Sequence, residues 1–61
     1  MINYHYYTEQ EIQPIFWASY VYANGDLIKI YSSCATKLIA DQLASAFIDG
    51  IKFGKANKEN D

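Results

Sequence analysis

The chain contains no arginine, a single cysteine and a single histidine among its 61 residues. One cysteine cannot form a disulfide within the chain, and one histidine with scattered carboxylates does not provide the ligand spacing of a metal site. Arginine is the usual residue for bidentate recognition of phosphate and guanine, and the formal net charge is −2. These absences argue against a disulfide-stapled protein, a metalloprotein and a nucleic-acid binder that relies on positive charge. We expect no cofactor.

Long apolar runs and targeting patterns are also missing. No apolar stretch approaches the roughly 20 residues needed to cross a bilayer. The segment Met1–His5 does not show the basic region followed by an apolar region that marks a secretory signal. A lone cysteine, Cys34, without such a signal is typical of a reducing compartment. We therefore expect a cytoplasmic protein.

Hydrophobic and aromatic residues are abundant instead. Hydrophobic residues make up 51% of the chain, which has six tyrosines and one tryptophan. A domain of this size buries only about 60% of the surface that its unfolded chain exposes, and small domains without disulfides or metals usually need a partner subunit. A second copy of the same chain is the simplest partner. The composition therefore predicts a homodimer.

Two strands around an Asn-Gly turn form the clearest pattern. Residues 15–22 are apolar on both faces, which is typical of a central strand covered on both sides. Asn24-Gly25 favours a hairpin turn that places Ala23 opposite Asp26. The returning strand is predicted over residues 27–32, with Leu27, Lys29 and Tyr31 on one face.

The segment before this hairpin is less distinctive. Residues 1–7 alternate loosely and favour either a third strand or an arm that becomes ordered on a partner. Residues 8–13 are polar and begin with a Thr-x-x-Glu pattern, so we expect a loop with at most one helical turn. Pro14 ends any such turn.

An amphipathic helix is predicted from about Cys34 to Asp49, capped by Ser32 or Ser33. Helical spacing predicts one buried stripe, which consists of Ala35, Leu38, Ile39, Leu43, Ala46, Phe47 and Ile51. The opposite side is polar and carries Lys37, Asp41, Ser45, Asp49 and Lys52. A second row, Ala40, Ala44 and Ile48, is suited to close approach of another helix or is half-exposed. The helix ends at Gly50 or Gly54, or residues 51–53 form a short strand.

The predicted fold class is therefore α+β: a small antiparallel β-sheet of two or three strands with one C-terminal amphipathic helix packed on one face. Residues 1–54 form a single domain, and residues 55–61 form a disordered polar tail. Two copies are expected to associate through the tyrosine-rich face or edge of the sheet.

Aromatic side chains on the strands are the best candidates for function, because tyrosine and tryptophan are enriched at binding hot spots. The candidate partner-binding residues are Tyr4, Tyr6, Tyr7, Trp17, Tyr20, Tyr22 and Tyr31. The expected function is a small non-enzymatic module that inhibits or regulates a larger protein. Free-standing proteins of this size in bacteria and phages are often inhibitors or anti-defence factors. This part of the expectation comes from protein size and not from the residues themselves.

Two other classes of function compete with this one. A tyrosine row can stack nucleobases, so a nucleic-acid or nucleotide binder is the main alternative. Cys34 near a helix N-terminus can be a nucleophile, with His5 of another subunit as its base. Nothing in the spacing brings Cys34 and His5 together, so we expect no enzymatic activity.

Overall fold

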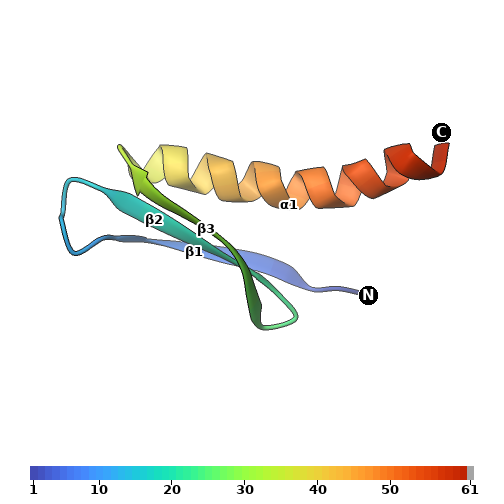
Figure 1. Cartoon of the computed structure of the whole chain (residues 1–61), viewed down its shortest axis with the longest axis horizontal. Coiled ribbons are helices and arrows are strands. Elements are labelled where there is room, and N and C mark those ends of the chain that lie inside the picture. Colours follow the sequence, from blue (N-terminus) through green and yellow to red (C-terminus); the bar gives the residue numbers. More distant parts are fainter. Residues whose placement is uncertain (61) are drawn as a thin grey trace.

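The computed structural model describes residues 1–60, with side chains described as far as Gly54. Strands β1 (Tyr4–Gln10), β2 (Trp17–Ala23) and β3 (Asp26–Cys34) precede helix α1 (Lys37–Asn60). The strands form one three-stranded antiparallel sheet in the order β1-β2-β3, and α1 lies along one of its faces (Figure 1). The predicted α+β class is confirmed, with three strands rather than two.

Strand β1 begins later and ends later than the sequence predicts. Its register with β2 runs without interruption from Tyr4 opposite Ala23 to Gln10 opposite Trp17. Residues 8–10, predicted as loop, therefore belong to the strand, and Thr8 Oγ1 lies 3.1 Å from Ser19 Oγ across the pair. Before the strand, the Asn3 amide donates to Asn24 Oδ1 at 3.0 Å, so the chain is held to the β2–β3 turn rather than forming a free arm.

Strand β3 pairs with β2 through two irregularities. Ala23 lies opposite Asp26, and the residues between them, Asn24 and Gly25, have φ angles of 52° and 85°. The register then shifts between Val21 and Tyr22 and again between Trp17 and Ser19. Leu27 lies opposite Tyr22, on the face away from the helix, as pairing across the turn predicts. The first shift then puts Lys29 opposite Val21, so Lys29 and Tyr31 lie on the helix side, whereas simple alternation predicts them beside Leu27.

Helix α1 differs from the prediction at both ends. Its cap is Thr36, whose Oγ1 accepts a hydrogen bond from the Ile39 amide at 3.1 Å, and Cys34 is the last residue of β3. Neither Gly50 nor Gly54 ends the helix, and residues 51–53 are helical rather than a strand. The polar tail expected at residues 55–61 stays a prediction: side chains beyond Gly54, and Asp61 altogether, lie outside the described residues.

The predicted buried stripe of the helix is wrong. The side of α1 that packs on the sheet consists of Ala40, Ala44 and Ile48, with Phe47 partly buried beside them. Leu38, Ile39, Leu43, Ala35 and Ala46 are exposed, and of the predicted stripe only Phe47 and Ile51 are half-buried. The reason is steric: Tyr4 and Tyr31 already fill the space above the sheet, so the helix presents small side chains to approach it.

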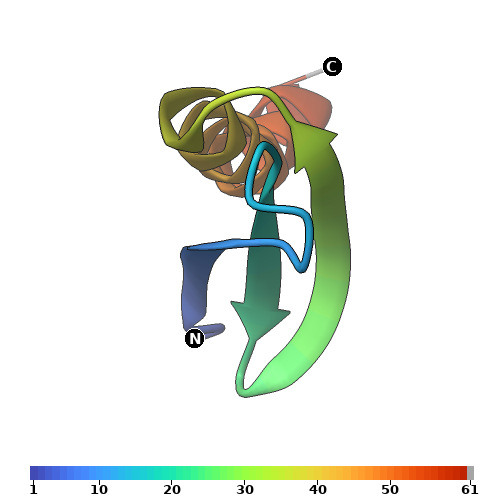
Figure 2. The same cartoon turned by 90° about the vertical axis from the view of Figure 1, so that its left-hand side faces the viewer.

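The molecule has two layers, and each layer has one uncovered face (Figure 2). Val21 and Ser19 are the largest fully buried side chains, and the core cluster comprises Val21, Ala44 and Ile48. This is a small core for a chain with so many apolar residues. The outward faces of the sheet and of α1 therefore carry large apolar side chains in contact with water.

Candidate protein-binding surface

The face of the sheet turned away from α1 is a continuous surface of aromatic and aliphatic side chains. Cross-strand pairing places His5 opposite Tyr22, Tyr7 opposite Tyr20, Tyr20 opposite Ile30 and Tyr22 opposite Leu27. Tyr7, Leu27 and Ile30 are 45%, 47% and 48% exposed. We call this the outer sheet face, and it consists of His5, Tyr7, Glu9, Ala18, Tyr20, Tyr22, Leu27 and Ile30.

Four rings on this face stack against one another. The centroid distances are 5.1 Å from His5 to Tyr22, 5.9 Å from Tyr22 to Tyr7 and 5.0 Å from Tyr7 to Tyr20. The interplanar angles are 5°, 17° and 24°. The two inner rings, Tyr22 and Tyr7, therefore have a neighbouring ring on either side. They present edges and hydroxyl groups to a partner rather than free flat faces.

Two hydroxyl groups of this stack, those of Tyr7 and Tyr22, share a hydrogen bond. A side-chain hydrogen bond with Tyr22, followed by desolvation, raises the pKa of Tyr7 to about 12. The Tyr7 phenol is therefore protonated at neutral pH. The surface offers neutral hydroxyl donors and acceptors among apolar ring edges, which is typical of protein-recognition surfaces.

Charge on the outer sheet face is negative. Glu9 lies on it, and none of the lysines whose side chains the structure describes lies there. Lys29 is on the helix side, 5.2 Å from the centroid of the Tyr31 ring, and Lys37 pairs with Asp41. At the end of this face, a cavity of about 330 Å³ is lined by Glu9, Glu11, Ala18 and Tyr20, among others.

A polar cluster fixes the sheet against the helix behind this face. Thr8 Oγ1 donates to Asp41 Oδ1 at 2.5 Å, and Lys37 Nζ lies 3.0 Å from Asp41 Oδ2. The Thr8 hydroxyl and then the Lys37 ammonium group hold the pKa of Asp41 below its ordinary value. Ser19, fully buried, lies within hydrogen-bond distance of Thr8 and of the Tyr7 carbonyl. This cluster links β1 and β2 to the start of α1 and lies against the backbone of Tyr7.

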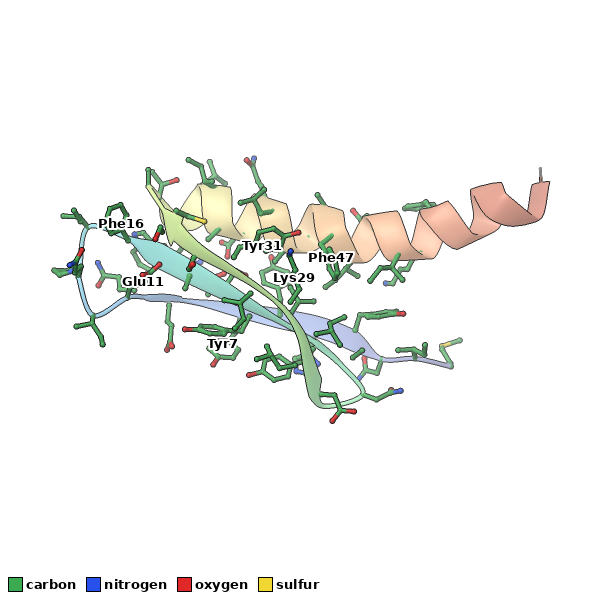
Figure 3. The ribbon with its side chains drawn as sticks, in the orientation of Figure 1. Tyr7, Glu11, Phe16, Lys29, Tyr31 and Phe47 are labelled. Atoms are coloured by element: carbon green, nitrogen blue, oxygen red, sulfur yellow. The ribbon has the colours of Figure 1, made fainter. Side chains whose placement is uncertain are left out.

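The seven predicted binding residues divide between the two faces of the sheet. Tyr7, Tyr20 and Tyr22 lie on the outer sheet face, as Figure 3 shows for Tyr7. Tyr4, Tyr6, Trp17 and Tyr31 share the helix side, where Tyr31 makes an edge-to-face contact with Phe47 at 6.2 Å. Tyr31 therefore does not extend the tyrosine row.

Five members of this surface were not among the predicted binding residues: His5, Glu9, Ala18, Leu27 and Ile30. Alternation along β1 places His5 on the same face as Tyr7, so that signal was present in the sequence. Leu27 opposite Tyr22 follows from pairing across the Asn-Gly turn. Ile30 reaches the face only because of the irregularity in β3, and no local pattern of residues predicts it.

The structure separates Cys34 from His5 within one copy. Cys34 is buried opposite Trp17, whereas His5 lies opposite Tyr22. Trp17 and Tyr22 are five residues apart on β2, which is about 16 Å along a strand. Among the described residues, no three or more His, Cys, Asp or Glu side chains gather as a candidate metal site. Within the same residues, α1 is not apolar enough over its length to span a bilayer.

Comparison with protein-family models, with curated proteins and with solved structures gives no match. The candidate surface therefore depends on the geometry and chemistry of this chain alone.

Proposed function

We propose that this chain is a non-enzymatic protein-binding module that inhibits or regulates a larger protein, acting in the cytoplasm as a homodimer. The observation that supports this best is the outer sheet face itself. Contiguous exposed apolar surface of this kind on a soluble domain usually marks an interaction site. Stiff aromatic side chains carry most of the energy at such sites, and Tyr7, Tyr20 and Tyr22 are the central contacts that we propose.

The charge of this surface indicates what its partner looks like. Glu9 on the face and Glu11 at its end are complementary to lysine or arginine side chains on the rim of an apolar patch. The proposed target is therefore a protein surface with an apolar centre and a basic edge. A phage-type anti-defence role is one setting in which such a small inhibitor works.

The nucleic-acid alternative receives less support from the same geometry. Bases stack on free ring faces in grooves of positive charge. The inner rings here stack on each other, and the charge that this face carries is negative. No specific observation favours this second function.

Affinity capture with matched variants tests the proposal. Immobilised wild-type chain is expected to retain a protein in stoichiometric amount from a lysate of the cells in which it acts. The double variant Tyr7→Ser/Ile30→Ser is expected to retain at least tenfold less of that protein. Leu38→Ser, which removes an exposed apolar side chain from the helix instead, is the control and is expected to retain it.

Two results would contradict the proposal. One is the absence of any stoichiometric protein on the wild-type chain. The other is equal retention by the wild-type chain and by the Tyr7→Ser/Ile30→Ser variant, which would mean that the outer sheet face is not the binding surface.

A further inference from the structure

The outward side of α1 carries a second apolar surface whose spacing is that of a helix-packing seam. Ile39, Leu43, Ala46, Gly50 and Phe53 follow one another at intervals of four, three, four and three residues. All five are exposed, with Ile39 at 42%, Leu43 at 39% and Phe53 at 66%. This alternation places the five on one side of a helix, as in the contact line of a coiled coil. We call them the outer helix seam.

The glycines of this helix have no explanation within one copy. Gly50 and Gly54 lie inside α1 rather than at its end, and both are exposed. A Cβ atom built at either position meets nothing within 4 Å, so the chain has room for a larger residue. Glycine is the least favourable helix residue apart from proline. Close approach of another helix at Gly50 and Ala46 would account for small residues at these positions.

Charge distinguishes the two uncovered faces of the molecule. The outer helix seam has no charged member, so pairing it with itself desolvates no charge. The outer sheet face contains Glu9 without a described lysine on the same face, so it complements a basic partner better than a second copy of itself. The two faces therefore suit different occupants.

We infer that the outer helix seam is the self-association surface of this chain, and that a second copy packs there with its helix antiparallel to the first. This inference rests on the proposed homodimer and names the surface that forms it. A two-fold axis near residues 44 and 45 sets Ile39 against Gly50 of the second copy and Leu43 against Ala46. Ile39 and Leu43 then each meet a small residue, which a parallel pairing of identical residues does not achieve. The tyrosines of both copies remain free for the target.

The length of the seam sets the strength of this dimer. Residues 39–53 span about 21 Å of helix at 1.5 Å per residue. One helix contact of that length buries less than the roughly 800 Å² per partner of a standard stable interface. We therefore expect a dissociation constant in the micromolar range rather than a permanent dimer.

Sedimentation velocity of the full chain from about 5 to 500 µM tests the assignment. The wild-type chain is expected to show a monomer–dimer equilibrium. Gly50→Gln places a polar side chain in the seam while improving helix propensity, and it is expected to raise the dissociation constant at least tenfold. Ser45→Gln adds the same side chain on the exposed helix surface outside the seam, and it is expected to change the constant less than twofold.

Cysteine cross-linking tests the orientation. The test uses Leu43→Cys and Ala46→Cys variants in a Cys34→Ala background, mixed in equal amounts. They are expected to form the disulfide between position 43 of one variant and position 46 of the other in preference to a disulfide between two copies of the same variant. Preference for the 43–43 and 46–46 disulfides would overturn the antiparallel arrangement.

The outcomes separate this inference from the proposed function. A dimer that survives Gly50→Gln but is lost in Tyr20→Ser would overturn the helix assignment and leave the homodimer in place. A chain that stays monomeric at 500 µM would overturn both the homodimer and this surface, while target capture by the outer sheet face would remain a separate measurement.

Discussion

Asp41 is the residue that connects the helix electrostatically to the sheet. Its carboxylate accepts a hydrogen bond from Thr8 on β1 and pairs with Lys37 one helical turn earlier. Both contacts need the charged form, and they hold the pKa of Asp41 below the ordinary value of 3.8. A group with a lowered pKa in the folded state stabilises the fold above its unfolded pKa. That stabilisation is lost as the pH falls through the folded pKa.

We therefore predict that Asp41→Asn is less stable than the wild-type chain at pH 6 and that the difference shrinks at pH 2.5. Urea unfolding at the two pH values measures it. Asp49→Asn, on the exposed side of the same helix, is the control and is expected to show a smaller change between the two pH values. An equal difference between wild type and Asp41→Asn at both pH values would contradict this role of the charge.

Single residues were the least predictable level of this structure. The sequence shows Thr8 as the start of a possible capping pattern, whereas it lies in β1 with its hydroxyl on Asp41. The partner of Thr8 is 33 positions away in the chain, so no local pattern reports the contact. For a comparable reason, Tyr31 lies on the face opposite to the one that alternation from Leu27 predicts, because an irregularity in pairing depends on the neighbouring strand rather than on Tyr31 itself.

Individual elements were predicted well in kind and less well in their limits. The apolar character of both faces of residues 15–22 correctly indicated a central strand, since β2 lies between β1 and β3. The cover on both faces that the same pattern predicts is present within one copy only on the helix side. A helix was expected in this part of the chain, but helical spacing assigned its buried side to the wrong one of two apolar rows. The sheet below it is crowded with rings, so Ala40 and Ala44 face inward and Leu43 faces outward. Periodicity finds an amphipathic helix, but two apolar sides on one helix require knowledge of what each side meets.

The start of α1 provides a prediction at the scale of the element. Thr36 caps the helix through its hydroxyl, whereas the sequence pointed to Ser32 or Ser33. Replacing an N-cap threonine with alanine typically costs about 1 kcal/mol. Thr36→Ala is therefore expected to lower the free energy of unfolding by about that amount in urea titration. Ser32→Ala removes the hydroxyl from a residue of β3 and is expected to change it by less than about 0.5 kcal/mol.

The whole molecule can be understood as one sheet layer and one helix layer with apolar surface on both outward sides. A globular domain normally turns its apolar surface inward, and among the described residues no further element covers either outward face. The uncharged outer helix seam then favours contact with a second copy, and the acidic outer sheet face favours contact with a basic partner. In the proposed arrangement, association would contribute to stability through the helix and to function through the sheet.

Equivalent tyrosine substitutions on the two sides of the sheet test this division. Tyr31, half-buried against Phe47, contributes to the core, so Tyr31→Ala is expected to lower the free energy of unfolding by about 2–3 kcal/mol. Tyr7 stacks on an exposed face, so Tyr7→Ala is expected to cost no more than about 1 kcal/mol but to weaken target capture. Urea unfolding and capture assays on the same two proteins provide both readouts. If Tyr7→Ala were the more destabilised variant, the outer sheet face would be a structural surface of the folded chain, because its rings would be needed for folding rather than kept available for a partner.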